Sequence, residues 1–210
     1  MRFAISNYTA YEVAEIVMTC QHNGWVRPTL YQGMYNAITR SVEAELFPCL
    51  RRYGLDFYAY NPLAGGFLTN RYIESNTSSK PTEGRFSDAS GILGERYRER
   101  YFKDAIFSAL KLVDQEAKKH DITMVQVALR WMVHHSPMKV KDNGPDGIII
   151  GVSSQKQLEE NLEALEQGPL PEELCEKLDE AWKVAKMDTP NYWHGKLSYG
   201  YDTRKELFGV

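Results

Sequence analysis

Apolar and polar residues follow one plan four times along the chain. Each time a short apolar run, typical of a strand covered on both faces, ends in small polar or glycine residues and leads into a segment with helix signals. The predicted strands are residues 2–6, 28–32, 57–60 and 147–151. Alternation of strands and helices predicts a parallel sheet with helical crossovers.

The helix signals differ from one unit to the next. Thr9 begins a capping box, and an apolar face follows it. After the second strand, apolar residues recur at i, i+4 and i+8 behind a cap at Thr39 or Ser41, and we expect Pro48 to kink this helix. After the fourth strand, residues 154–157 form another capping box. The apolar stripe behind that box consists of Leu158, Leu162 and Leu165.

A long insertion separates the third and fourth strands. Residues 70–94 show no period and are rich in small polar residues, and loops of this length are usually functional or disordered. The other predicted helices are residues 95–120, with a break near Lys103, 123–135 and 172–187. We expect no helix in the tail, residues 189–210.

Polar or glycine-rich residues follow every predicted strand, at the edge where parallel sheets bind ligands. The third of these segments combines a strand-end aromatic, Tyr60, with Gly65-Gly66 and the cation Arg71. Such a set could stack a flat ring and hold a phosphate, and a tight turn with a core tyrosine is the alternative. Ser153-Ser154 starts a predicted helix, where backbone N–H groups favour an anion. Together the four segments favour a phosphate-bearing ligand.

Composition excludes some functions. The net charge of -3 gives no reason to expect nucleic acid or a membrane surface as partner, and no apolar run reaches membrane-spanning length. The first residues lack secretory-signal features, and the three scattered cysteines lack metal-ligand spacing, so we expect a cytoplasmic protein with reduced thiols.

The adjacent His134 and His135 point to different sides of a helix and do not indicate a metal site. Acidic neighbours neutralise the arginine- and tyrosine-rich residues 97–101.

Four stretches carry a more specific signature. They are Ser-Asn-Tyr at 6–8, Tyr-Gln-Gly-Met-Tyr-Asn at 31–36, Tyr-Ala-Tyr-Asn-Pro-Leu-Ala-Gly-Gly at 58–66, and Gly-Val-Ser-Ser at 151–154 with Gln-Leu-Glu-Glu-Asn at 157–161. These stretches resemble the aldo-keto reductases, most closely the branch of aflatoxin aldehyde reductases and succinic semialdehyde reductases. The resemblance implies an α/β fold, the C-terminal half of a TIM (β/α)8 barrel with four parallel strand-helix units plus inserted helices. We expect a single incomplete domain over residues 1–210, with the match over 3–193 and an extra tail over 194–210.

The resemblance also implies an NADP(H) site and the residues that form it. Ser6, Asn7 and Gln32 would hold the nicotinamide carboxamide, Tyr60 would stack on the ring, and Arg85 would be a further contact. The pyrophosphate would be wrapped by Asn61, Pro62, Leu63, Ala64, Gly65, Gly66, Phe67, Leu68, Thr69, Asn70 and Arg71. The adenosine and its 2′-phosphate would lie in the segment that contains Gly151, Ser153, Ser154, Gln157, Glu160 and Asn161.

The implied activity is reduction of a small carbonyl substrate, in a pocket lined by Tyr97 and Arg100. The family's catalytic Asp, Tyr, Lys and His lie on its first four strands, and this chain matches from the fifth, so we expect no catalytic residue here. Trp193 is followed by His194, where the branch has an arginine that meets a substrate carboxylate. A preference for carboxylate-bearing substrates therefore stays open.

Two further interpretations remain beside a carbonyl reductase. One is a non-catalytic homologue that binds NADP(H) weakly or associates with another chain. The other, from the pattern alone, is a small doubly wound nucleotide-binding domain. A four-stranded section of a barrel would have two unpaired edges, which are templates for pairing with another chain. We therefore expect that the chain forms a homodimer through these edges, aggregates or stays partly molten.

Overall fold

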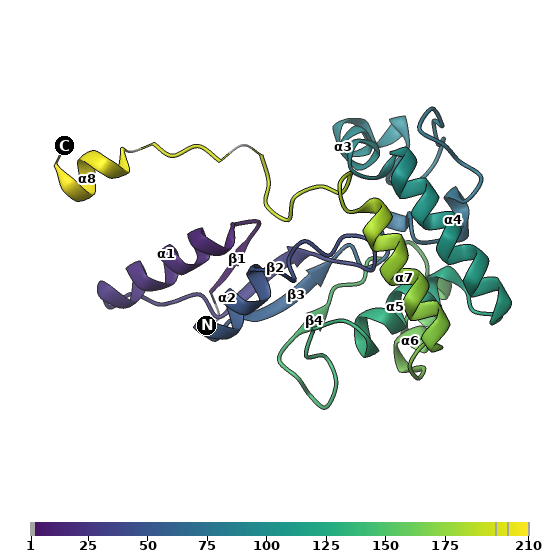
Figure 1. Ribbon diagram of the computed structural model, residues 1–210, viewed down its shortest axis with the longest axis horizontal. Coiled ribbons are helices and arrows are strands. Elements are labelled where there is room, and N and C mark those ends of the chain that lie inside the picture. The colour runs from purple at the N-terminus through teal and green to yellow at the C-terminus, as the bar shows by residue number, and fades with distance from the viewer. Residues whose placement is uncertain (1–2, 196, 201, 210) are drawn as a thin grey trace.

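A four-stranded parallel sheet lies at the centre of the computed structural model, which describes residues 3–195, 197–200 and 202–209 (Figure 1). The strands are hydrogen-bonded in chain order: β1 (Ala4–Ser6), β2 (Leu30–Met34), β3 (Asp56–Tyr60) and β4 (Gly147–Ile148). The register pairs Ile5 with Tyr31, Tyr31 with Phe57, and Ala59 with Ile148. Parallel strands in chain order, joined by helices, form part of a TIM barrel, as the sequence predicts.

Helix α1 (Ala10–His22) begins as predicted. The side chain of Thr9 accepts from the backbone N–H of Glu12, and Glu12 Oε2 accepts from Thr9 N at 2.7 Å. Its buried face, which includes Val13 and Val17, packs on the sheet core.

Helix α2 (Leu46–Tyr53) begins later than the sequence suggests. Thr39 pairs with Asn36 in an isolated bridge instead of capping the helix. Pro48 is the third helical residue, where a backbone N–H would have no helical partner anyway. The predicted kink at Pro48 is therefore wrong.

The insertion between β3 and β4 is a packed structure and not an open loop. Short helical turns lie at Asn70–Tyr72 and Asp88–Ser90, and the buried rings of Tyr72 and Phe86 anchor the segment. The Phe86 ring stacks on Phe102, with centroids 5.1 Å apart, at the break between two helices. The remaining helices are α3 (Gly91–Tyr101), α4 (Asp104–Lys119), α5 (Met124–His134), α6 (Gln155–Glu166), α7 (Glu172–Ala185) and α8 (Thr203–Phe208). The sequence did not predict α8.

Helices α3 to α7 gather beyond one end of the sheet, and α1 lies along its other side (Figure 1). None of the helices within the described ranges is long and apolar enough to cross a membrane.

The strands differ in their bounds from those predicted: β1 starts at Ala4, β3 starts one residue earlier than expected, and β2 and β4 differ more. Strand β2 starts two residues later than expected and includes Gly33, where a Cβ would lie 2.6 Å from the Phe57 ring, so glycine is the residue that fits between the packed aromatics. Strand β4 has only two residues instead of five. Its ladder ends where Ile149 N donates to Ala59 O at 2.8 Å.

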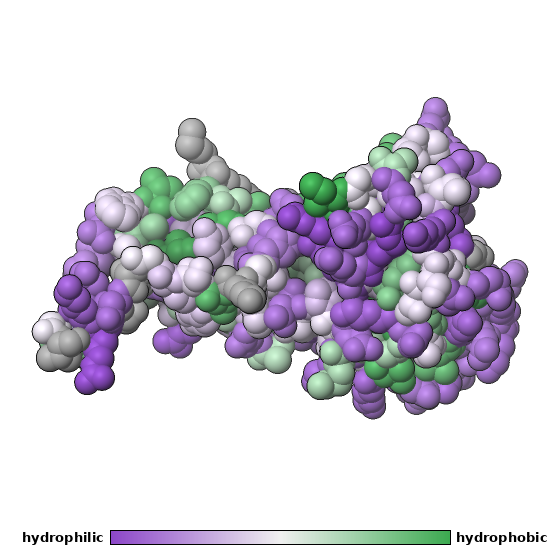
Figure 2. Space-filling model, turned by 90° about the horizontal axis from the view of Figure 1, so that it is seen from above, coloured by the Kyte–Doolittle hydropathy of each residue, from purple (hydrophilic) through white to green (hydrophobic). Residues whose placement is uncertain are grey.

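Apolar side chains remain exposed near both edges of the sheet. The leucine stripe of α6 does not form its buried face, so that prediction is wrong. Leu158 and Leu162 are 37% and 46% exposed, while Asn161 and Ala164 are buried. Near β1, the exposed apolar residues are Phe3, Trp25 and Val26. Figure 2 shows apolar residues at the surface on the α1 side of the molecule.

The buried carboxylate of Asp146 joins three segments. It accepts from the backbone N–H of Phe57 at 2.8 Å and of Lys139 at 2.7 Å, and it pairs with the guanidinium of Arg51. The side chain is fully buried, so these bonds replace its hydration. They hold the start of β3, the segment before β4 and α2 together.

We predict that Asp146→Ala lowers the free energy of unfolding by roughly 3 kcal/mol or more, because it leaves two backbone N–H groups and a partly buried cation without their acceptor. Urea unfolding measures the loss. Asp142→Asn, at an exposed position of the same segment, is the matched control and should stay within about 0.5 kcal/mol of the wild type. Equal losses of unfolding free energy in Asp146→Ala and Asp142→Asn would contradict a stabilising role of the Asp146 carboxylate.

Candidate functional site

A cavity of about 290 Å³ lies at the C-terminal ends of β1, β2 and β3. It is lined by Ser6, Asn7, Gln32, Tyr60, Leu93, Arg96, Tyr97, Arg100 and His194. The structure thus brings together four of the predicted nicotinamide-binding residues and both predicted substrate residues. The sequence analysis did not include Leu93, Arg96 or His194 as site residues.

Two asparagines turn the chain just beyond β1 and β3, and Asn7 lines the cavity. Asn7 and Asn61 have φ of 65° and 58°, the left-handed region that asparagine tolerates better than most residues. The turn at Asn7 lets its Oδ1 accept from the Tyr60 hydroxyl at 2.9 Å. The ends of β1 and β3 are therefore connected by side chains as well as by the sheet.

Tyr97 of α3 forms one wall. Its hydroxyl donates to Asn61 Oδ1 at 2.9 Å and accepts from Arg85 Nη1 at 3.3 Å. The ring lies directly against Gly65, where a Cβ would be 2.3 Å from a ring carbon. Arg85 and Arg100 both lie over this ring, at 5.8 and 5.7 Å from its centroid. Gly65 therefore provides the space that places the tyrosine between two cations.

Asn61 also has a buried donor without a partner. Its Nδ2 makes no hydrogen bond within the described residues, although its Oδ1 and its backbone oxygen are both used. Leaving a buried N–H group unpaired costs free energy, so a ligand acceptor that reached it would bind more favourably.

His194 reaches the cavity from the segment after α7. Its Nε2 lies 3.3 Å from Arg100 Nη2 and 3.2 Å from the Tyr60 hydroxyl. Burial, together with the charges of Arg100 and Arg96, lowers the pKa of His194 below its ordinary value.

The Tyr60 phenol is held as a donor. Burial raises its pKa above the ordinary value, and the nearby Arg100 opposes that shift. The group is protonated at neutral pH and can donate a hydrogen bond in the cavity.

The predicted pyrophosphate segment is largely part of the core. Pro62, Ala64, Phe67 and Leu68 are buried, and Leu63 packs against them. Gly65 and Gly66 are half-buried at positive φ, and Thr69 Oγ1 donates to Gly66 O at 2.7 Å. The side chain of Asn70 lies outside the described residues. This segment could therefore meet a ligand mainly through its backbone and glycines.

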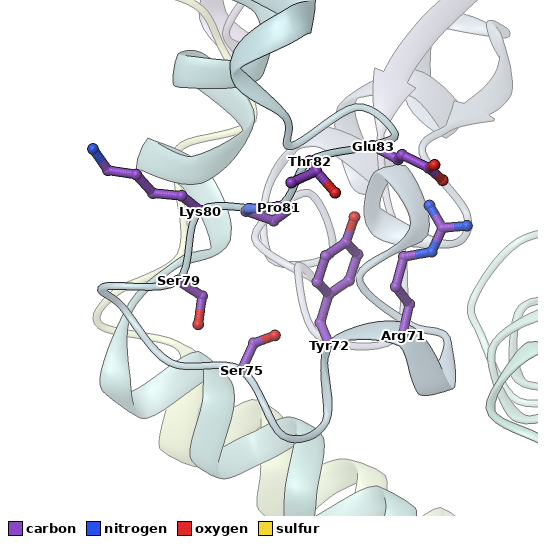
Figure 3. Close-up of a pocket in the computed structure, with 8 residues that line it drawn as sticks. All are labelled: Arg71, Tyr72, Ser75, Ser79, Lys80, Pro81, Thr82 and Glu83. Carbon is purple, nitrogen blue, oxygen red and sulfur yellow. The ribbon is translucent and has the colours of Figure 1, made fainter.

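Arg71 lies apart from the cavity. It lines a separate, open hollow of about 370 Å³ formed by the inserted segment, in which its guanidinium points toward Glu83 (Figure 3). The exposed Lys80 points away from the hollow (Figure 3).

The start of α6, predicted to bind the 2′-phosphate, makes hydrogen bonds of its own. Gln157 Oε1 accepts from the backbone N–H of Ser153 at 2.9 Å and from its hydroxyl at 3.0 Å, and Gln157 N donates to Ser154 Oγ. Glu160 is exposed and pairs with Lys156 at 3.8 Å. A phosphate there would have to displace the Gln157 carbonyl.

Arg85 connects this segment with the cavity. Its Nη2 would be 3.4 Å from a Cβ at Gly151, and its Nη1 reaches Tyr97.

The adjacent histidines make separate contacts. His134 Nε2 lies 2.7 Å from the carbonyl of Gln167, and His135 Nε2 accepts from Leu170 N at 2.8 Å. Within the described residues, no group of three or more His, Cys, Asp or Glu could hold a metal ion.

Helical spacing could have found two of the three missed residues. Arg96 and Arg100 are four residues apart, as are Leu93 and Tyr97, so both pairs repeat along adjacent rows of α3. His194 carries no such signal, because it belongs to a segment without a period.

The sequence is similar to known proteins along most of its length. A family model described as "Aldo/keto reductase family" matches residues 2–183. Aflatoxin B1 aldehyde reductase member 2 of Rattus norvegicus is 48% identical over 197 residues, which cover 92% of this chain and 53% of that protein. Aldo-keto reductase family 7 member A3 of Homo sapiens is 45% identical over 197 residues, 92% of this chain and 58% of that protein. The chain thus spans about half the length of these curated relatives.

We predict that Gly65→Ala lowers the free energy of unfolding by roughly 3 kcal/mol, the sum of about 1–2 for a left-handed alanine and about 1–3 for overpacking against Tyr97. Gly66→Ala is the matched control, because it also has positive φ but nothing within 4 Å of its Cβ position. Gly66→Ala should lower the free energy of unfolding only by the roughly 1–2 kcal/mol that a left-handed alanine costs. Urea unfolding of both variants tests this. A Gly65→Ala variant that is no less stable than Gly66→Ala would contradict the close packing of Gly65 against the Tyr97 ring.

Proposed function

This chain belongs to the aldo/keto reductase family, and on that premise we propose that it is part of an NADP(H)-dependent carbonyl reductase. The reaction is hydride transfer from the nicotinamide to the carbonyl carbon of a small aldehyde or ketone. The cofactor supplies the hydride when bound, and the protein binds and orients it. We place the protein in the cytoplasm, which the three unpaired cysteines support.

The observation that carries the proposal is the cavity at the strand ends. A hydroxyl and two amides (Ser6, Asn7 and Gln32) line the cavity together with Tyr60, and these are the groups that would pair with a carboxamide beside a flat ring. At about 290 Å³ the cavity is large enough for a nicotinamide ring and a small carbonyl compound, but not for a whole dinucleotide. The other parts of the cofactor would lie outside it.

The residues around the cavity are compatible with those other parts. Asn61 has a buried N–H group without a partner, and Arg85 offers a cation between the cavity and Gly151. The start of α6 could bind the 2′-phosphate after displacement of Gln157, since a helix N-terminus favours anions. This supports NADP(H) over NAD(H).

A second candidate function is a non-catalytic homologue that binds NADP(H) or associates with another chain. It is favoured by the exposed apolar side chains near both sheet edges.

Absence of the catalytic Asp, Tyr, Lys and His from these 210 residues stays a prediction. Loss of a positioned general acid alone costs about 10²–10⁴-fold in rate. NADPH oxidation with 4-nitrobenzaldehyde by this chain should be slower than in full-length relatives by at least that factor.

We predict that the chain binds NADPH more tightly than NADH and that Tyr60→Ala weakens NADPH binding roughly tenfold, because a stacked aromatic pair contributes about 0.5–1.5 kcal/mol beyond its buried area. Fluorescence titration of both cofactors measures this. Tyr60→Phe is the matched control, which keeps the ring but loses the hydroxyl contacts, and should stay within about threefold of the wild type. Equal affinity for NADPH in Tyr60→Ala and wild type would contradict stacking, and equal affinity of the wild type for NADPH and NADH would contradict the cofactor preference.

We propose, separately, that two copies associate through the sheet edges. Light scattering after size exclusion should give a mass about twice 24.1 kDa that falls on dilution. Ile149→Lys together with Val152→Lys, at exposed positions just after β4, should weaken the association, whereas Met187→Lys, at an exposed position after α7, should not. A monomer at every concentration, with concentration-independent unfolding, would contradict it.

A further inference from the structure

Asn36 lies two residues beyond the end of β2, outside the set of residues that line the cavity. Its side chain is completely buried, so both ends of the amide need protein partners. The Oδ1 atom accepts from the backbone N–H of Ile38 at 3.1 Å, and the backbones of Asn36 and Thr39 pair in a bridge. The local turn therefore fixes the orientation of the amide.

The other end of this amide reaches the turn after β3. Its Nδ2 donates to the carbonyl oxygen of Asn61 at 3.1 Å, and the same oxygen accepts from Ala64 N at 2.8 Å. Asn61 and Ala64 both have positive φ, 58° and 51°, which costs free energy in residues other than glycine. Such conformations persist when surrounding contacts hold them, and the bond from Asn36 is one of these contacts.

The turn in its place positions one wall of the cavity. The Oδ1 atom of Asn61 accepts from the Tyr97 hydroxyl at 2.9 Å, and the Tyr97 ring lies directly against Gly65. Both of these partners belong to the turn that Asn36 holds. Tyr97 lines the cavity, so a shift of the turn would move this wall.

Asn36 also contacts the helix that carries the wall. Tyr101 lies one helical turn after Tyr97 on α3, and the two rings stack with their centroids 6.4 Å apart. Burial raises the pKa of Tyr101, and a hydrogen bond with the Asn36 side chain opposes that shift. One buried amide thus connects the end of β2, the turn after β3 and α3.

We propose that Asn36 is a positioning residue for the cavity: through its bond to the Asn61 carbonyl it holds the turn after β3 in the conformation that places Tyr97. The positioning rests on the contacts above, and its effect on nicotinamide binding rests on the proposed function. Asn36 acts through Asn61 and touches no group inside the cavity.

NMR of the 210-residue chain tests the positioning without any ligand. In the wild type, the close approach of Tyr97 to Gly65 should give strong NOEs between the ring and the Gly65 Hα protons, whose chemical shifts the ring current should displace. Asn36→Ser keeps a hydroxyl that can accept from Ile38 N but is too short to reach the Asn61 carbonyl. Its NOEs should weaken and its Gly65 Hα shifts should move toward ordinary values. Unchanged NOEs and shifts would overturn the positioning.

Thr39→Val, in the same buried loop, is the matched control. Thr39 is 2% exposed, and its Oγ1 makes no hydrogen bond within the described residues, so valine removes a polar atom without removing a bond. The NOEs between Tyr97 and Gly65 should stay as in the wild type. Equal changes in Asn36→Ser and Thr39→Val would overturn a specific role of Asn36.

Hydrogen exchange in the wild type decides the matter if Asn36→Ser does not fold. The Nδ2 protons of Asn36 should exchange with solvent much more slowly than those of the exposed Asn143, because they are buried and bonded to the Asn61 carbonyl. Equally fast exchange at the two side chains would overturn the positioning.

A double-mutant cycle shows whether Asn36 acts through Asn61. Tyr97→Phe keeps the ring but removes the hydroxyl that donates to Asn61 Oδ1. If Asn36 works through this bond, Asn36→Ser and Tyr97→Phe together should lower the affinity for NADPH by less than the product of their separate effects. A combined loss equal to that product would overturn the route through Asn61.

Two probes distinguish the positioning from the proposed function. We expect Asn36→Ser to bind NADPH roughly threefold to tenfold more weakly than the wild type, the factor for one lost hydrogen bond. Adenosine 2′,5′-bisphosphate, which lacks the nicotinamide, should bind both proteins equally. Equal weakening of both probes, or unchanged NADPH binding, would overturn the effect on the cavity. If the wild type binds neither probe, that counts against the proposed function, whereas the NMR comparison alone decides the positioning.

Discussion

The carboxylate of Asp146 accepts hydrogen bonds from parts of the chain that lie far apart in sequence. It holds the start of β3 through Phe57 N, the segment before β4 through Lys139 N, and α2 through Arg51. Strand β4 has only two paired residues, so the ladder alone would hold it weakly. The carboxylate fixes where β3 begins, and β3 in turn carries Tyr60 to the edge where the site forms.

The site depends on backbone conformations at the strand ends. Asn7 and Asn61 turn the chain through the left-handed region, and each then uses its Oδ1 to accept from a tyrosine hydroxyl, Tyr60 or Tyr97. Gly65 admits the Tyr97 ring. These local features account for a cavity whose polar groups come from three strands, the turn after β1, one helix and the segment after α7. Its positive charges come from Arg96 and Arg100, which lie on one helix.

Local signals predicted much of the fold. The capping box at Thr9, the predicted helix start at Thr123 and the break near Lys103 lie where the structure has helix boundaries. The effect of Pro48 depends on where the helix starts, and α2 starts at Leu46, where Leu46 and Phe47 are buried, so the proline lies in the first turn and causes no kink.

The leucine stripe of α6 shows a second limit of periodicity. Small and polar residues, Ala164 and Asn161, form the buried side, because the fold and not the apolar pattern decides which face meets a neighbour. Six of the nine residues that line the cavity could be named from sequence, through the resemblance to the family. His194 could not, because it belongs to a segment without a period.

The central claim is that the cavity at the ends of β1, β2 and β3 holds the nicotinamide. Intermolecular NOEs between the nicotinamide ring protons of NADPH and the side chains of the 210-residue chain test it most directly. The account predicts NOEs from the nicotinamide ring to the ring protons of Tyr60, in the cavity that Gln32 and Asn7 also line. NOEs from the adenine alone, or nicotinamide contacts confined to residues outside this cavity, would contradict it.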